Sequence, residues 1–95
     1  MPRRNLAPSQ VERIAANLKA AREALDLSPA ELCRRTGIQP NTYSQWEGAK
    51  GRPSLDEALR LCAGLGYTLD WIYRGDPSGL PARIASRLSA PQAAE

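Results

Sequence analysis

The sequence predicts an all-α domain, a compact bundle of five short helices with a further short helix possible at the C-terminus. Apolar residues recur at steps of three and four in successive segments, which is the spacing of one helix face. Serine or proline stands where most of these segments begin, and glycine where most of them end. The 95 residues, 42% of them hydrophobic, suit one domain with one small core.

The first helix is expected from Gln10 to about Asp26. Ser9 and Glu12 have the spacing of a capping box, in which the serine oxygen accepts the amide at the third helical position and the glutamate bonds back to the cap. The apolar face of this helix is formed by Val11, Ile14, Leu18, Ala21 and Leu25.

The second helix starts with a similar signal and has only two turns. Ser28 stands at the N-cap, Pro29 at the first helical position and Glu31 at the third, which predicts a second capping box. Gly37 ends the helix, because glycine adopts the left-handed conformation that a side chain would resist.

The third helix, from Pro40 to about Glu47, carries mostly polar residues. Ile38 just before it, and Tyr43 and Trp46 within it, are expected to anchor it to the core. Glycines and a proline follow it, at Gly48, Gly51 and Pro53.

The two remaining helices of the domain also have recognisable start and stop signals. A third capping box, Ser54 with Glu57, opens a helix that closes at Gly64 and Gly66, and a short helix over 69–74 ends at Gly75. We expect Leu59 on the shoulder of the first of these helices and a buried stripe made of Leu55, Ala58, Leu61, Cys62 and Leu65.

The predicted organisation is a flexible basic arm (1–8), a helical domain (9–75) and a C-terminal extension (76–95). That extension holds the further short helix, with Leu80, Ile84 and Leu88 at steps of four, followed by a frayed tail.

A two-turn helix, a glycine turn and a second short helix together describe a helix-turn-helix. The outward face of its second helix, residues 40–47, would present side chains that pair with base edges in the major groove, as Asn and Gln do with adenine. The alternative is a merely solvated polar face, which the preceding capped helix and the basic loop after it argue against. The expected base-contacting residues are Gln39, Asn41, Thr42, Ser44 and Gln45.

Phosphate contacts are expected on both sides of that helix. Lys50 and Arg52 lie in the loop just beyond it, and Ser28 lies at a helix N-terminus, where free amides favour anions. Arg3 and Arg4 in the arm could reach the DNA backbone or the minor groove, or could be solvated charges.

Composition argues against several other classes of protein. The net charge of +3 is only mildly basic and is weak support for a polyanion partner by itself. With no histidine and two distant cysteines, Cys33 and Cys62, we expect no metal, no cofactor and no enzymatic activity. No apolar run is long enough to span a membrane, and the N-terminus lacks the apolar region of a signal peptide, so a cytoplasmic protein is expected.

Residues 13–75 resemble the Cro/C1-type helix-turn-helix domain (XRE family) of lambdoid phage repressors and related bacterial regulators. The resemblance rests on the arginine of the first helix, "AEL", the small Cys33, Gly37, "QWE" with "GAK", and "LGYTLDWI". It implies a lambda-repressor-like fold, a partly buried ion pair between Arg22 and Glu47, and base contacts by Asn41 and Gln45. Pro29 stands where relatives often have a phosphate-contacting glutamine, and Pro40 where they often have a polar base reader, so the base code is expected to be unusual.

The resemblance also implies a homodimer on a palindromic operator and a transcriptional regulator, which we expect to be a repressor. Its control would be by abundance, by a partner or by autorepression. The expected dimer contacts are Leu59, Leu69, Trp71 and Tyr73. Leu80, Ile84 and Leu88 would either extend that surface or pack on the protomer's own core. An alternative function is the antitoxin of a toxin–antitoxin pair, which would bind a toxin through its C-terminal tail as well as DNA.

Overall fold

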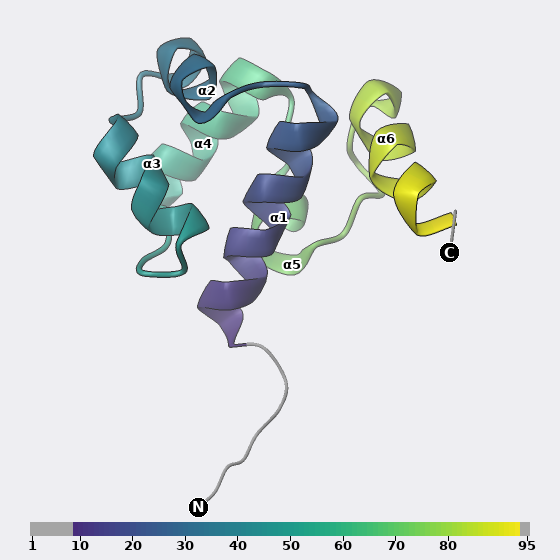
Figure 1. Cartoon of the computed structure of the whole chain (residues 1–95), viewed down its shortest axis with the longest axis horizontal. Coiled ribbons are helices and arrows are strands. Elements are labelled where there is room, and N and C mark those ends of the chain that lie inside the picture. The colour runs from purple at the N-terminus through teal and green to yellow at the C-terminus, as the bar shows by residue number, and fades with distance from the viewer. Residues whose placement is uncertain (1–8, 94–95) are drawn as a thin grey trace, which may run out of the picture.

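The computed structural model describes residues 9–93, with side chains up to residue 88, and these residues form helices without any strand (Figure 1). The helices are α1 (Gln10–Ala24), α2 (Pro29–Thr36), α3 (Pro40–Glu47), α4 (Leu55–Leu65), α5 (Leu69–Arg74) and α6 (Ala82–Ala93). The predicted all-α class is confirmed, and the further C-terminal helix is present. The basic arm, with Arg3 and Arg4, lies outside the described residues.

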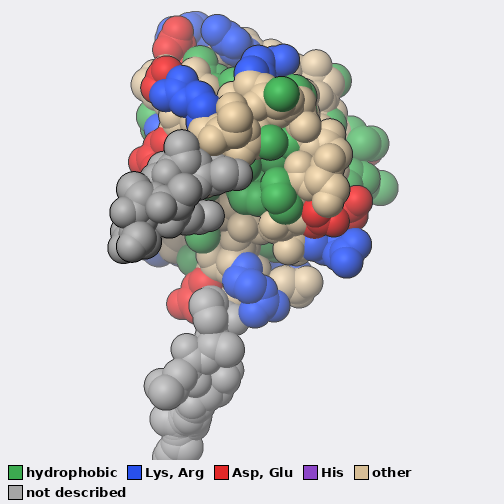
Figure 2. All heavy atoms as spheres, turned by 90° about the vertical axis from the view of Figure 1, so that its right-hand side faces the viewer, with side chains coloured by type: hydrophobic (Ala, Val, Ile, Leu, Met, Phe, Trp, Pro, Cys, Tyr) green, Lys and Arg blue, Asp and Glu red, His purple; other side chains and the backbone are tan. Residues whose placement is uncertain are grey.

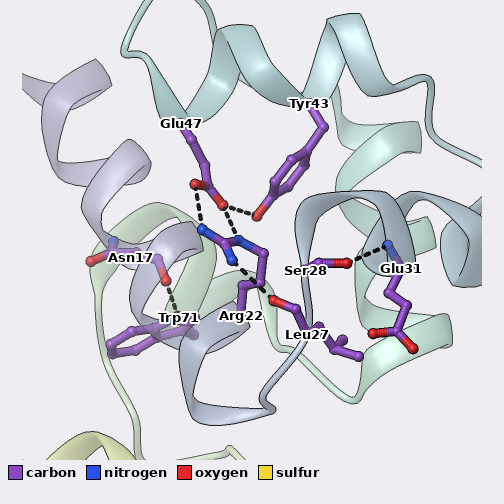
Figure 3. A network of polar contacts seen from close by, with 8 residues as sticks. All are labelled: Asn17, Arg22, Leu27, Ser28, Glu31, Tyr43, Glu47 and Trp71. Carbon is purple, nitrogen blue, oxygen red and sulfur yellow. Dashed lines mark hydrogen bonds and ion pairs between the residues drawn. The ribbon is translucent and has the colours of Figure 1, made fainter.

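Local capping fixes where most helices begin. In the boxes Ser9–Glu12 and Ser54–Glu57, the serine oxygen accepts the glutamate amide at 3.2 Å and the glutamate carboxylate accepts the serine amide at 2.8 Å. The expected box at Ser28 is only half formed: its oxygen accepts the Glu31 amide at 3.1 Å, but the Glu31 carboxylate points away (Figure 3).

The turns that follow the helices are fixed by backbone conformation. Gly37 has a φ of 77°, so the chain reverses between α2 and α3 in a conformation that glycine adopts without strain. The first helix ends at Ala24, two residues earlier than expected, because Asp26 already has a φ of 58°. These two turns set the path of the chain into and out of α2.

α1 is the central element of the core, and it packs against α3, α5 and α6 (Figure 1). Two hydrogen bonds join it to α5: the Trp71 indole donates to the Asn17 carbonyl at 2.9 Å, and the Asn17 amide donates to the Ile72 carbonyl at 3.2 Å. Trp71, expected at a dimer contact, is therefore buried in the core of its own protomer. The fully buried apolar side chains include Ile14, Leu18, Leu32, Leu61, Ile72 and Ile84.

α6 belongs to the same core. Leu80 and Ile84 are buried within it, and Leu88 packs against it. Arg87 pairs with Asp26 through two bonds of 2.9 and 3.3 Å, and Arg83 donates to the Leu65 carbonyl at 3.3 Å, at the C-terminal end of α4. The hydrophobic core thus continues past residue 75, and α6 fastens to the ends of both α1 and α4.

The molecule's α6 side shows hydrophobic side chains at its centre, with acidic and basic residues around them (Figure 2). The described residues of this face carry both signs of charge, so they do not form the uniformly basic surface that a polyanion favours. α3 and the loop after it lie on the opposite side of the molecule, at the left of Figure 1. A nucleic-acid interface is therefore to be sought on the α3 side.

The expectation that Leu55 lies in the buried stripe of α4 is wrong: Leu55 is 59% exposed. At about 100° per residue, Leu55 points roughly 120° away from Leu61, which faces the core. Leu59, one turn further on, is 48% exposed, as its shoulder position predicts. The buried face of α4 is narrower than the sequence pattern indicated and consists of Ala58, Leu61 and Leu65, with Cys62 partly buried beside it.

Candidate nucleic-acid interface

Two aromatic side chains hold α3 in place by its inner face. Tyr43 is 1% exposed and Trp46 is 3% exposed, and their rings meet edge to face with centroids 5.8 Å apart. Ile38, in the turn before α3, is also buried. Because these apolar anchors occupy one side of the short helix, its polar residues are forced to the other side.

The outer face of α3 carries the predicted base-contacting residues. Gln39, Asn41, Ser44 and Gln45 are exposed, and Thr42 is partly buried. Glu47 is the one acidic residue of α3, and its charge is paired with Arg22. The face therefore presents amide and hydroxyl groups without an uncompensated negative charge, which suits contact with the edges of base pairs.

A partly buried polar network braces α3 against α1 (Figure 3). The Arg22 guanidinium donates to both carboxylate oxygens of Glu47, from Nε to Oε2 at 2.7 Å and from Nη2 to Oε1 at 3.0 Å. It also donates from Nη1 to the Leu27 carbonyl at 2.9 Å, while the Tyr43 hydroxyl donates to Glu47 Oε2. One arginine thus ties α1 to the end of α3 and to the turn before α2.

The network shifts the pKa values of its members. Burial alone would raise the pKa of the Glu47 carboxyl, but the hydrogen bonds from Arg22 and Tyr43 outweigh it and hold that pKa below its ordinary value. The pKa of Tyr43 is raised, first by burial and then by its bond to Glu47. At neutral pH the brace is therefore a charged pair with a neutral tyrosine hydroxyl.

The loop between α3 and α4 is fixed at several points. The Lys50 amide donates to the Gln45 carbonyl at 2.8 Å, and Arg52 donates from Nη1 to the Gln10 side chain at 3.0 Å. Pro53 is buried, and its carbonyl accepts the Tyr73 hydroxyl at 2.9 Å. The loop thus holds the exposed Lys50 and Arg52 side chains on a defined backbone next to α3.

Ser28, also expected to contact phosphate, is exposed at the N-terminus of α2. Its oxygen already accepts the Glu31 amide, but its hydroxyl hydrogen remains able to donate to an anion.

Sequence reasoning missed Arg34 as part of this surface. A shallow hollow lies between α2 and the start of α3, and Arg34 lines it together with Gln39 and Pro40. The same hollow is lined by Ala30, Cys33, Gly37 and Ile38. In the sequence, Arg34 is one of two adjacent arginines near the end of a helix, a pattern typical of solvated charge. Only the angle between α2 and α3 places Arg34 and Gln39 on the same hollow.

The four expected dimer residues do not form one exposed surface. Leu59 is exposed, Leu69 and Tyr73 pack partly against the core, and Trp71 is buried. Within residues 9–93 there is no group of three or more His, Cys, Asp or Glu side chains placed to hold a metal ion. No helix among these residues is long and apolar enough to cross a membrane.

Comparison with known proteins adds one finding. A family model described as helix-turn-helix, of the Cro/C1 type, matches residues 18–72, a stretch that contains α2, α3 and the turn between them. No curated protein and no solved structure is matched by the chain.

Proposed function

Since the chain belongs to the Cro/C1-type helix-turn-helix family of DNA-binding transcriptional regulators, we propose that it is a sequence-specific repressor that reads the major groove with α3. The observation that carries this proposal is the outward polar face of α3, held by the buried Tyr43 and Trp46. A major groove about 12 Å wide admits one helix, and a two-turn polar helix fits it without burying any apolar side chain against DNA.

Asn41 and Gln45 are the proposed base readers. They are exposed and four residues apart, so they share one face of α3. With its oxygen an amide side chain can accept from the N6 amino group of adenine, and with its NH2 group it can donate to N7, which gives it a two-point contact that other base pairs do not offer. Gln39, Thr42 and Ser44 lie on the same short helix or at its cap and supply further donors and acceptors.

Lys50, Arg52 and Ser28 are the proposed phosphate contacts, and Arg34 joins them because it lies beside Gln39 in the hollow between α2 and α3. Phosphate contacts set the orientation of the protein on the duplex and supply affinity that depends on salt but not on sequence. Arg3 and Arg4 remain candidates for the same role.

One helix-turn-helix covers only half of an operator, so the proposed regulator acts as a homodimer on a palindrome, with half-sites about one helical turn apart. Binding at a promoter would exclude the transcription machinery. Autorepression is the simplest form of such regulation, because it needs no effector.

A toxin partner is not favoured by the packing of residues 76–88. Leu80 and Ile84, the apolar positions that a partner would need, are buried in the protomer's own core, and Leu88 packs against it. The antitoxin alternative therefore rests on the family resemblance alone.

The function is tested by selecting bound sequences from a pool of random duplexes and by footprinting the DNA upstream of the protein's own gene. We expect an enriched palindromic motif and protection of a matching site. Equal affinity for all duplexes in the pool would refute sequence-specific reading, and a motif absent from the upstream region would refute autorepression alone.

A further inference from the structure

We propose that the outward stripe of α4 formed by Leu55 and Leu59 docks on the same stripe of a second copy of this chain, with the two α4 helices antiparallel across a two-fold axis. This contact would form the dimer that the proposed function requires. Of the four dimer residues expected from the sequence, only Leu59 lies on this surface.

The stripe contains the most exposed large hydrophobic side chains of the described chain. Leu55 and Leu59 are the only large hydrophobic side chains that are exposed between residues 9 and 88. They are four residues apart on α4, so they lie one above the other, and the exposed Ala63 continues the same line. A single exposed leucine is ordinary, whereas two exposed leucines one turn apart on a helix form a small apolar patch that a partner can cover.

Charges beside the stripe indicate which partner it fits. Asp56 and Arg60 are exposed, and each follows one of the two leucines, so they form a parallel charged stripe along its edge. Neither takes part in an ion pair with any other residue that the structure describes. α4 thus carries an apolar pair and an oppositely charged pair, both with the same spacing of four.

Such a pattern is self-complementary under a two-fold axis perpendicular to the helix. When the axis passes near residues 57 and 58, Leu55 faces the partner's Leu59, and Asp56 faces the partner's Arg60. The leucine pairs centre on residue 57 and the charged pairs on residue 58, an offset of about 1.5 Å that a long arginine side chain spans easily. A parallel alignment would instead set each charge against its own copy, so the charges favour the antiparallel arrangement.

The same charges argue against DNA as the occupant of this surface. Asp56 and Glu57 lie in the first turn of α4, where they would repel phosphate, and the capping box there already uses the Ser54 and Glu57 groups. Four leucines make a small apolar core, so the dimer is expected to be weak in solution. A duplex with two half-sites would strengthen it by holding both copies close together.

Sedimentation equilibrium of the full chain without DNA, up to millimolar concentration, tests the surface directly. We expect a monomer–dimer equilibrium that Asp56→Arg weakens at least about tenfold, because arginine would then face the partner's Arg60. Arg60→Asp should weaken it similarly, and the double exchange D56R/R60D should restore dimerisation. Asp70→Arg, the same change of charge at an exposed site on α5, is the matched control and should leave the equilibrium unchanged.

Circular dichroism melting of each variant shows whether it is folded. A chain that stays monomeric at every concentration would overturn the assigned surface. So would a dimer that D56R does not weaken, or a folded D56R/R60D variant that does not dimerise.

The DNA readout is judged separately with a duplex that carries one half-site. Sequence-selective binding of a monomer there, without any dimer, would refute the α4 surface and leave the proposed reading by α3 standing. A dimer that binds DNA without sequence selectivity would support the α4 surface and refute the proposed reading by α3.

Discussion

Arg22 of α1 and Glu47 of α3 meet in a two-point ion pair, with bonds of 2.7 and 3.0 Å and side chains only 13% and 16% exposed. The pair joins the central helix to the end of the helix that we propose reads DNA. Because Arg22 also bonds the Leu27 carbonyl and Glu47 accepts the Tyr43 hydroxyl, removing either charge leaves partly buried polar groups without a partner.

We expect Glu47→Ala to lower the free energy of unfolding by about 3–5 kcal/mol, because Arg22 would keep its charge in a mostly buried position. Urea denaturation measures this change. The exposed pair Arg74–Asp70 is the control, since Arg74→Gln should cost less than about 1 kcal/mol. Equal effects of the two substitutions would contradict a structural role for the Arg22–Glu47 pair.

As the pH is lowered, the free energy of unfolding should decrease more steeply for the natural protein than for the Glu47→Gln variant. The folded pKa of Glu47 lies below its ordinary value of 4.5. Its contribution to stability is therefore fully present above pH 4.5 and is lost as the pH falls through the lower, folded pKa. Urea denaturation of both proteins along a series of acidic buffers checks this, and parallel curves would show that Glu47 titrates identically in the folded and unfolded chain.

Asn41→Ala and Gln45→Ala should each cost roughly 1–3 kcal/mol in binding at the cognate base pair and relax the preference there. Both side chains are exposed, so thermal stability should change by less than about 0.5 kcal/mol. Binding assays against single-base operator variants make the measurement. If the variants lost affinity equally for every sequence, these residues would be contacting the backbone and not the bases.

Lys50→Ala, Arg52→Ala and Arg34→Ala should weaken binding to all duplexes alike. Each lost phosphate contact should also reduce the slope of log K against log salt by about 0.9. Arg74→Ala, at an exposed position on α5, is the matched control for a lost positive charge away from α3. Titrations at several salt concentrations measure the slopes, and an unchanged slope for Arg34→Ala would remove Arg34 from the interface.

Ile84→Ala should destabilise the fold by about 2–5 kcal/mol, because Ile84 is 0% exposed in the core shared by α1 and α6. Leu59→Ala, at an exposed leucine, should change stability by less than about 0.5 kcal/mol. Urea denaturation compares the two. A small effect at Ile84 would mean that α6 is only loosely attached to the domain.

The helix starts were predictable because capping is local. Ser9 and Ser54 bond to residues three positions ahead, so the sequence window that contains the signal also contains its partner. The outward polar face of α3 was predictable for a similar reason, since the positions of Tyr43 and Trp46 determine which side of a short helix is buried. The half-formed box at Ser28 shows the limit of this reasoning, because spacing alone does not fix where the Glu31 side chain points.

The exposure of Leu55, the burial of Trp71 and the place of Arg34 could not be predicted in the same way. Each depends on how remote segments pack together. The packing of α4 against α2 and α5 leaves Leu55 uncovered, the Asn17 carbonyl accepts the Trp71 indole N–H across the bundle, and the angle between α2 and α3 sets Arg34 and Gln39 on one hollow. Periodicity gives the direction of a side chain around its own helix but not which neighbouring helices surround that helix.

Short-range signals in the amino-acid sequence establish that this chain is helical, where most of its helices begin and which family it belongs to, because caps, turns and apolar spacing act within a few residues along the chain. Tertiary structure alone decided that α6 joins the core, that one arginine links α1, the turn before α2 and α3, and that two leucines of α4 stay uncovered. Burial and ion pairing between segments depend on the packing of helices that are remote in sequence, and no short window of residues contains that information.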